Sequence, residues 1–225
     1  DTFPENSQDL DLQFPVVFKK SNGKKSIGIR TNIRSFEELV PIIASSEGSF
    51  IIQAMVFGKE YRLLLYKKSI LGALELVPPQ IFGNGVNTIA ELIESKNLNL
   101  QRKIIINAKV METLEKNSLS LDTILAKDSC FSLQENSCLA EGGSSIDCTD
   151  VVHETILALA IKSAQALNLA LSGIDIICED ISLDATKQKV SFLEINSSPS
   201  LSIHYNPTVG KTQNVIRTIL EDIFK

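Results

Sequence analysis

The chain has 225 residues, of which 22 are basic and 27 acidic, for a net charge of −5. This length can bury a sizeable core in one large domain or two small lobes. The acidic balance and dispersed basic residues exclude a typical nucleic-acid-binding surface. No apolar run approaches the roughly 18 residues of a membrane span, and the N-terminus has no signal-peptide pattern. We therefore expect a soluble, cytoplasmic protein with neither a nucleic-acid nor a membrane partner.

The cysteines and histidines lack the spacing of a metal or disulfide framework. There is no C-x-x-C pair, and the two histidines lie far apart in the sequence. The cysteines are Cys130, Cys138, Cys148 and Cys178. Reduced thiols in a cytoplasmic protein are therefore favoured over a zinc site or a disulfide framework.

The first part of the chain predicts a small lobe of strands around one helix. A loop at 20–28 with two glycines separates the first two strands, and Ser35 is a good N-cap for a helix to about residue 44. The apolar runs that follow are split by Gly58 and a Lys-Lys pair. The runs are residues 14–19, 50–56, 60–66 and 70–77. We expect the last three to form an antiparallel series.

The second part of the chain predicts helices followed by two strands. Thr88 caps a short helix to about residue 96, and Asp150 is a good N-cap for a long, alanine-rich helix to about residue 167. Two apolar runs then carry Asp175 and Glu194, and an amphipathic helix ends the chain. We expect both runs to be buried strands.

Three oxygen-bearing side chains stand out on these two strands. Asp175, Glu194 and Asn196 are each bracketed by apolar residues, so the strands would bring them to one place. Such ligands, without His or Cys, suit a hard octahedral cation such as Mg²⁺. The alternative is a strand that ends in an Asn-Ser-Ser-Pro turn, with its acids bound by backbone N–H groups or by Arg.

Several short motifs in one order resemble the ATP-grasp superfamily of carboxylate-amine ligases. They are PVVFK at 15–19, the loop at 23–28, GKEYR at 58–62, GID at 173–175 and LEIN at 193–196. Closer matches are VP at 77–78, GNG at 83–85, TIAELI at 88–93, ENS at 135–137 and GGSSIDCTD at 142–150. These resemble the glutathione-synthetase module of bacterial bifunctional enzymes and the ATP-grasp domain of cyanophycin synthetases.

The resemblance covers roughly residues 12–225 and implies an α+β ATP-grasp fold with nucleotide held between two α+β lobes. After a polar lead-in at 1–12, the small lobe would span 13–80 and carry the phosphate loop and adenine segment. The larger lobe, 81–225, would carry the metal and substrate site. Complete relatives have a further N-terminal domain, so we expect a missing N-terminal domain or a partner chain.

The resemblance also implies a nucleotide site. Lys19 would bind the phosphates or the adenine edge, and backbone N–H groups of the loop would lie over the phosphates. The adenine segment is 53–56, and Glu60 would accept hydrogen bonds from the ribose. The implied cofactor-binding residues are Lys19, Ser26, Ile27, Gly28, Gln53, Ala54, Val56 and Glu60. An ordinary hairpin at the loop, and a solvated edge charge at Glu60, are the alternatives.

The implied reaction is ATP-dependent ligation of an acid to an amine. Asp175, Glu194 and Asn196 would hold Mg²⁺, with Mn²⁺ as an alternative, and Arg62 and Asn136 would be catalytic. The γ-phosphoryl group would pass to a carboxylate, and an amine would attack the acyl-phosphate to give an amide. The implied partners are small-molecule acid and amine substrates, and a homo-oligomer is compatible with the sequence.

The chain departs from this pattern at several motif positions. Leu76 and Gln134 stand where the relatives carry arginines that face phosphate or the acyl-phosphate, and Leu has no charge to offer. Gln53 replaces a Glu, Asn84 replaces an Asp, and residues 140–141 replace a Ser-Thr pair. The second hypothesis is therefore a catalytically impaired ATP-grasp nucleotide-binding module with a regulatory or assembly role.

His204 follows the predicted metal strand closely. It would either line the substrate site or be a hydrogen-bonded structural residue.

Overall fold

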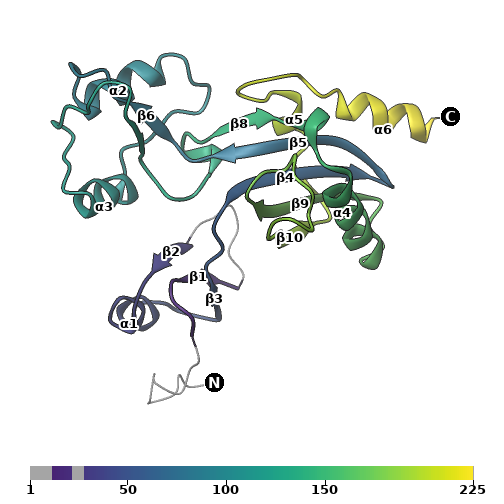
Figure 1. The fold of residues 1–225 in the computed structure, drawn as a ribbon, viewed down its shortest axis with the longest axis horizontal. Helices are drawn as coiled ribbons and strands as arrows, with labels where there is room; N and C mark the ends of the chain where they lie inside the picture. Colours follow the sequence, from purple (N-terminus) through teal and green to yellow (C-terminus); the bar gives the residue numbers. More distant parts are fainter. Residues whose placement is uncertain (1–11, 22–27, 225) are drawn as a thin grey trace. The chain divides into compact units, whose positions relative to one another are not determined.

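The structure is a computed structural model that describes residues 12–21 and 28–224. The chain divides into two compact units, Asp1–Val56 and Phe57–Lys225. Figure 1 shows the elements of both units as a ribbon. The sequence analysis placed a boundary near residue 80, between two lobes expected to hold a nucleotide. That boundary stays a prediction. Ser26 and Ile27, expected in the phosphate loop, lie outside the described residues.

The first unit is a three-stranded antiparallel sheet with one helix on its core face. The strand order is β2-β1-β3, with β1 at Val16–Lys20, β2 at Arg30–Ile33 and β3 at Phe50–Ala54. Helix α1, Phe36–Ala44, begins as predicted, because the Ser35 hydroxyl accepts a hydrogen bond from the backbone N–H of Glu38. Leu39 packs with Val16 and Phe18 in a small core.

The second unit is built on a five-stranded antiparallel sheet of order β10-β9-β4-β5-β8. Its strands are β4, Lys59–Tyr66; β5, Ser69–Val77; β8, Ser144–Asp147; β9, Leu171–Cys178; and β10, Ser191–Asn196. The β4–β5 hairpin confirms two of the predicted strands. The prediction of one series from β3 to β5 was wrong, because β3 pairs with β1 in the first unit.

Helix α4, Glu154–Ala166, covers one face of this sheet. Its Ile156, Ala160 and Ala164 are fully buried against Leu63 and Ile174 of the strands. The small alanine side chains let the helix lie close to the sheet. The predicted N-cap at Asp150 was wrong. Asp150 lies in a short 3₁₀ turn, Thr149–Val151, and an extended Val152 separates that turn from the helix, so His153 is the N-cap.

A helical part of the second unit has its own core. It contains strands β6, Gln80–Phe82, and β7, Cys130–Ser132, with helices α2, Ile89–Asn97, and α3, Ala108–Lys116. Helix α2 begins at the predicted cap, where Thr88 and Glu91 form a reciprocal capping box. Figure 1 shows these elements together at one end of the ribbon, away from α4.

The face of the large sheet opposite α4 is partly covered by chain that follows β10. Helix α5, Ser202–Tyr205, brings Ile203 onto Leu74 and Leu76 of β5, and Leu139 from a 3₁₀ turn, Leu139–Glu141, joins them. Helix α6, Val215–Ile223, ends the described chain. The half of this face on β4, β9 and β10 carries polar side chains.

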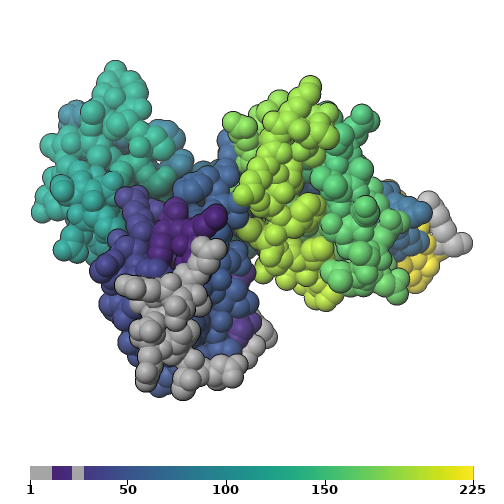
Figure 2. All heavy atoms as spheres, turned by 60° about the horizontal axis from the view of Figure 1, so that its bottom comes forward, coloured from purple at the N-terminus to yellow at the C-terminus, as the bar shows by residue number. Residues whose placement is uncertain are grey.

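Strand β10 departs from the prediction of a buried strand. It is the edge strand of the sheet in the described residues, with alternating exposure along its length. Figure 2 shows segment 180–200, in light green, at the molecular surface beside the darker green of α4. Glu194 is one of the exposed residues of this strand.

Two further observations concern the sequence-based exclusions. None of the helices in the described ranges combines the length and the apolar character that crossing a membrane requires. The four cysteines are free thiols.

Candidate functional site

Three charged residues lie side by side across β4, β9 and β10. In the strand register, Arg62 is opposite Asp175, and Asp175 is opposite Glu194. Residues directly opposite each other in an antiparallel pair project to the same face. The row Arg62, Asp175 and Glu194 therefore forms one charged line across three strands, and we call it the charged row.

Two more polar side chains extend the charged row along its strands. Glu60 precedes Arg62 by two positions on β4, and Asn196 follows Glu194 by two on β10. A strand alternates its side chains, so both share the face of the row. The intervening residues, Tyr61 and Ile195, belong to the α4 core instead. The predicted residues Asp175, Glu194 and Asn196 are thus brought together, with Glu60 and Arg62 beside them.

Arg62 and Asp175 form a two-point ion pair. The Arg62 guanidinium donates through Nε to Oδ1 of Asp175 and through Nη2 to Oδ2, the latter at 2.5 Å. Asp175 is only 4% exposed. Its burial raises its pKa to about 6 although Arg62 acts to lower it, and the neighbouring Glu194 adds to the rise. The buried carboxyl group of Asp175 and the carboxyl group of the exposed Glu194 are therefore close enough to disfavour each other's ionisation.

The donor set fits a divalent cation. Asn196 donates through Nδ2 to Oε1 of Glu194 at 2.8 Å, which leaves the Asn196 amide oxygen as an acceptor. Mutual repulsion of Asp175 and Glu194 is what a bound cation relieves. No cluster of three or more His, Cys, Asp or Glu side chains suited to a metal occurs in the described ranges. Two carboxylates and an amide thus suit an ion that completes its shell with phosphate and water.

Glu60 is held by a segment distant in sequence. The hydroxyl of Ser137 donates a hydrogen bond to Oε2 of Glu60. Burial raises the pKa of Glu60, while Ser137 and Arg62 counteract the rise and Glu194 adds to it. A solvated edge charge, the alternative interpretation of Glu60, does not describe this half-buried carboxylate.

The segment that carries Ser137 contains two further buried amides. Gln134 is 2% exposed, and neither of its amide atoms has a hydrogen-bond partner among the described residues. The same holds for Oδ1 of Asn136, a residue predicted to be catalytic. Buried polar groups rarely lack partners, so these amide atoms are candidates for contact with a ligand group.

The chain after β10 folds back over the sheet beside the charged row. A Cβ atom on Gly173 would lie 2.7 Å from Cβ of Pro199, so only glycine permits this approach. Gly173 stands opposite Asn196 in the register. The GID and LEIN motifs are thus joined physically, since the glycine of the first makes room for the turn that follows the second.

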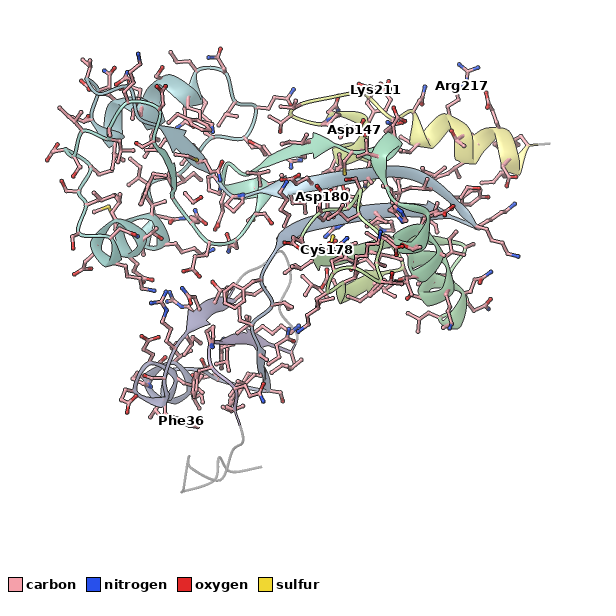
Figure 3. All side chains as sticks on the ribbon, viewed as in Figure 1. Phe36, Asp147, Cys178, Asp180, Lys211 and Arg217 are labelled. Atoms are coloured by element: carbon pink, nitrogen blue, oxygen red, sulfur yellow. The ribbon has the colours of Figure 1, made fainter. Side chains whose placement is uncertain are left out.

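His204 lies on the same face but is packed rather than accessible. It is 0% exposed, its ring sits against Gly72, and neither ring nitrogen has a partner among the described residues. Burial, together with the charge of Arg62, lowers the pKa of His204 to about 4, while Asp147 opposes the shift. Asp147, labelled in Figure 3, ends β8 opposite Leu74. The burial of the ring favours a structural residue, but the hydrogen bonds expected of such a residue are absent from the described part of the chain.

Leu76 occupies an apolar setting on the β5 side of the same face. It is 7% exposed and packs with Leu74 and Ile203. It stands directly opposite Glu60 in the β4–β5 register. Leu76, which stands where the family resemblance implies an arginine, is therefore part of a small core.

Two residues expected to contact nucleotide lie on one face of the first unit, whereas Ala54 lies on the other face, opposite Val16 in the register. Lys19 and Gln53 share the face opposite the core, because Val17 lies opposite Gln53 and two positions from Lys19. Ala54 ends β3, Val56 follows at the end of the unit, and Gly28 has a left-handed backbone with φ +79°. Their roles toward a nucleotide stay predictions.

Sequence reasoning allowed for an acid bound by Arg, but it did not identify the two pairings found at this site. The Arg62–Asp175 pair joins residues 113 positions apart, and the Ser137–Glu60 contact joins residues 77 positions apart. The ENS motif did point to the right segment, but it singled out Asn136 and not the serine beside it.

Comparison with known proteins identifies the fold around this site. No protein-family model matches the chain. The chain is 32% identical over 220 residues to the glutathione biosynthesis bifunctional protein GshAB of Desulfotalea psychrophila, covering 92% of this chain and 28% of that protein. It is 29% identical over 225 residues to cyanophycin synthetase of Synechocystis sp., covering 94% of this chain and 26% of that protein.

Among solved structures, the chain resembles a bifunctional glutathione synthetase from Pasteurella multocida. The TM-score is 0.66 at 28% identity, over 93% of this chain and 30% of that one. The chain has the ATP-grasp fold. The predicted α+β ATP-grasp fold is confirmed, and the named relatives of this ATP-grasp chain are ligases. The chain spans about a quarter of the length of the curated relatives it matches.

Proposed function

We propose that this ATP-grasp chain is the nucleotide-binding module of an ATP- and Mg²⁺-dependent carboxylate-amine ligase that acts through an acyl-phosphate. The observation that carries the proposal is the charged row with Asn196, in a chain whose relatives over more than nine-tenths of its length are synthetases. A site of this composition serves phosphoryl transfer through positioning and charge, without a side-chain nucleophile.

The second unit would supply the cation site and one wall of the reaction site. Asp175, Glu194 and Asn196 would hold the cation, which when bound neutralises charge on the triphosphate. Arg62 keeps Asp175 ionised and oriented through its two-point contact, so that the acid can serve as a ligand. The carboxylates of Asp175, Glu194 and Glu60 in turn favour the charged form of Arg62. Asn136 would present its unpartnered amide oxygen to the reacting groups.

Each unit, taken by itself, carries residues that we propose contact the nucleotide. Glu60 would accept hydrogen bonds from the ribose hydroxyls. Lys19 and the backbone at Gly28 would contact phosphates, and segment 53–56 would contact adenine. Lys19 and Gln53 share one face of their sheet, which supports a common ligand for the two.

The relatives extend well beyond the part that this chain matches. The matched curated proteins are about four times as long as the matched part. We propose that a further domain or a partner chain supplies contacts to the acid and the amine. Which acid and amine are joined depends on those contacts.

Calorimetric titration with a nonhydrolysable ATP analogue, with and without Mg²⁺, tests the proposal. We expect binding that requires Mg²⁺ in the unmodified chain and is lost in Glu194→Ala. Glu94→Ala, which removes an exposed carboxylate on α2, is the matched control and should bind as the unmodified chain does. Unchanged Mg²⁺-dependent binding in Glu194→Ala would remove the metal assignment.

A second candidate function is nucleotide binding without ligation. Leu76 favours it, because an apolar residue packed against Leu74 and Ile203 cannot contact phosphate with a charge. The discriminating experiment measures ADP release by the protein in its full natural length over a panel of acid and amine pairs. Mg²⁺-dependent binding without any ADP release would support the second candidate, and acid-dependent ADP release would exclude it.

A further inference from the structure

Ser137 makes a contact whose geometry suggests a role in nucleotide recognition. Its hydroxyl donates to Oε2 of Glu60 from a buried position, 7% exposed. Glu60 lies opposite Leu76 and Ile177 in its two strand ladders, so no ladder neighbour offers it a charge or a donor. The nearby Arg62 is committed to Asp175. Within the described ranges, Ser137 is therefore the hydrogen-bond donor that orients this carboxylate.

The segment around Ser137 is built to place this hydroxyl. Its start is tied to the β6 side, where the backbone N–H of Leu133 donates to the carbonyl of Pro79 at 2.8 Å. Its end is closed by the N–H of Gly143, which donates to the carbonyl of Cys138 at 3.2 Å. A Cβ atom on Gly143 would lie 2.9 Å from the carbonyl oxygens of Ser137 and Cys138. Glycine at 143 thus allows the chain to pass close behind Ser137.

The contact uses one oxygen of Glu60 and leaves the other for a ligand. Oε1 has no donor among the described residues, and a carboxylate oxygen accepts hydroxyl hydrogen bonds readily. We infer that Ser137 is a positioning residue that fixes the Glu60 carboxylate so that its second oxygen accepts a hydrogen bond from a sugar hydroxyl of the bound nucleotide. This inference rests on the proposed function, since it requires a nucleotide at Glu60.

The inference gives Ser137 a different role from that of its neighbours. Gln134 and Asn136 have unpartnered amide atoms in the same segment, whereas Ser137 has its hydroxyl engaged. Ser137 therefore acts through Glu60 and not by direct contact with the reacting groups. Loss of its hydroxyl would free the carboxylate to rotate, which weakens an oriented hydrogen bond more than it weakens phosphate contacts.

The test compares two nucleotides in four forms of the chain. ATP and 2′,3′-dideoxy-ATP, each with Mg²⁺, are titrated calorimetrically into the unmodified chain, Ser137→Ala, Ser137→Thr and Ser132→Ala. We expect Ser137→Ala to bind ATP about tenfold more weakly and the dideoxy nucleotide nearly unchanged, the size of one hydrogen bond to a charged group. Ser137→Thr keeps a hydroxyl and should restore the preference for ATP. Ser132→Ala also loses a side-chain hydrogen bond, to Gln80, and should keep that preference.

Ser137→Thr keeps the inference falsifiable if Ser137→Ala perturbs folding, because it must retain the preference for ATP, and a double-mutant cycle with Glu60→Ala tests the route of the effect. If Ser137 acts through Glu60, Ser137→Ala should not change the ratio of the two affinities once Glu60 is absent. If Ser137→Ala weakens the binding of both nucleotides equally, or leaves the ratio of their affinities unchanged, the inference is overturned. Mg²⁺-dependent binding by the unmodified chain would still uphold the proposed function. Failure of the unmodified chain to bind either nucleotide would overturn both.

Discussion

Two halves of one sheet face in the second unit differ sharply in chemistry. On β9 and β10, the face carries Asp175, Glu194 and Asn196, and β4 adds Arg62. On β5, the same face carries Leu74 and Leu76, packed under Ile203. Strand β4 lies between the two halves. The apolar half packs against Ile203 of α5 and forms a small core on this face. The charged half is therefore not needed for that core and remains polar.

The comparison also explains why Arg62 is paired so closely. The guanidinium lies next to the apolar half, since Leu74 is its partner on β5 and Asp175 is its partner on β9. A charge at such a boundary is costly unless its hydrogen bonds are satisfied. The two-point contact with Asp175 meets that need, and it orders one of the expected cation ligands.

The largest expected effect comes from breaking the pair at this boundary. Arg62→Ala leaves the buried Asp175 carboxylate without its partner, and we expect a loss of about 3–5 kcal/mol in the free energy of unfolding. Urea denaturation measures it. Lys59→Ala removes the exposed cation of a surface pair on the same strand and should cost less than about 1 kcal/mol. A loss below about 1 kcal/mol for Arg62→Ala would mean that Asp175 is stable without the pair.

The apolar half should be destabilised by an arginine at position 76, where the family resemblance implies one. Leu76→Arg places a charge among Leu74 and Ile203, and we expect a loss of about 3 kcal/mol in the free energy of unfolding. The volume-conserving Leu76→Met should cost less than about 1.5 kcal/mol. Thermal and urea unfolding of both variants measure the difference. If Leu76→Arg is as stable as the unmodified chain, this half of the face can open to admit a charged group.

A smaller, pH-dependent effect should come from His204. Its pKa is lowered to about 4 in the folded chain, because burial disfavours the charged ring. Between about pH 4 and the unfolded value near 6.5, the unfolded state binds the proton and the folded state does not. Stability from this group is therefore present above pH 6.5 and is lost as the pH falls toward 4, by up to about 3 kcal/mol.

Comparison with His204→Leu isolates this contribution from other titrating groups. The difference in free energy of unfolding between the two chains should change by on the order of 2 kcal/mol between pH 7 and pH 4.5, with the unmodified chain losing relative stability. Chemical denaturation across this pH range measures it. A difference that does not vary with pH would contradict the burial of a neutral His204.

Local sequence signals predicted the parts of the fold that depend on neighbouring residues. The caps at Ser35 and Thr88 were correct because each side chain bonds to a backbone N–H three residues on. The cap at Asp150 was wrong because the chain makes a 3₁₀ turn first, where tertiary packing decides. The ATP-grasp fold was predicted from the order of short motifs that are spread over most of the chain.

The site was only partly predictable for a physical reason. Motif order indicated that Asp175 and Glu194 would meet, and the β9–β10 register brings them opposite each other. The pairing of Arg62 with Asp175 and of Ser137 with Glu60 depends on strand register and loop path between residues far apart in sequence. One residue of slip would turn each side chain to the other face, and no local pattern reports it.

The central claim is that the charged half of this face is a cation-dependent nucleotide site. Electron paramagnetic resonance of Mn²⁺ in the presence of a nonhydrolysable ATP analogue tests it most directly, because the signal of free Mn²⁺ decreases when the ion binds. We predict nucleotide-dependent uptake of Mn²⁺ by the unmodified chain, strongly reduced in Glu194→Gln and retained in Glu94→Gln. Equal uptake by the unmodified chain and Glu194→Gln, or no uptake by either, would contradict the claim.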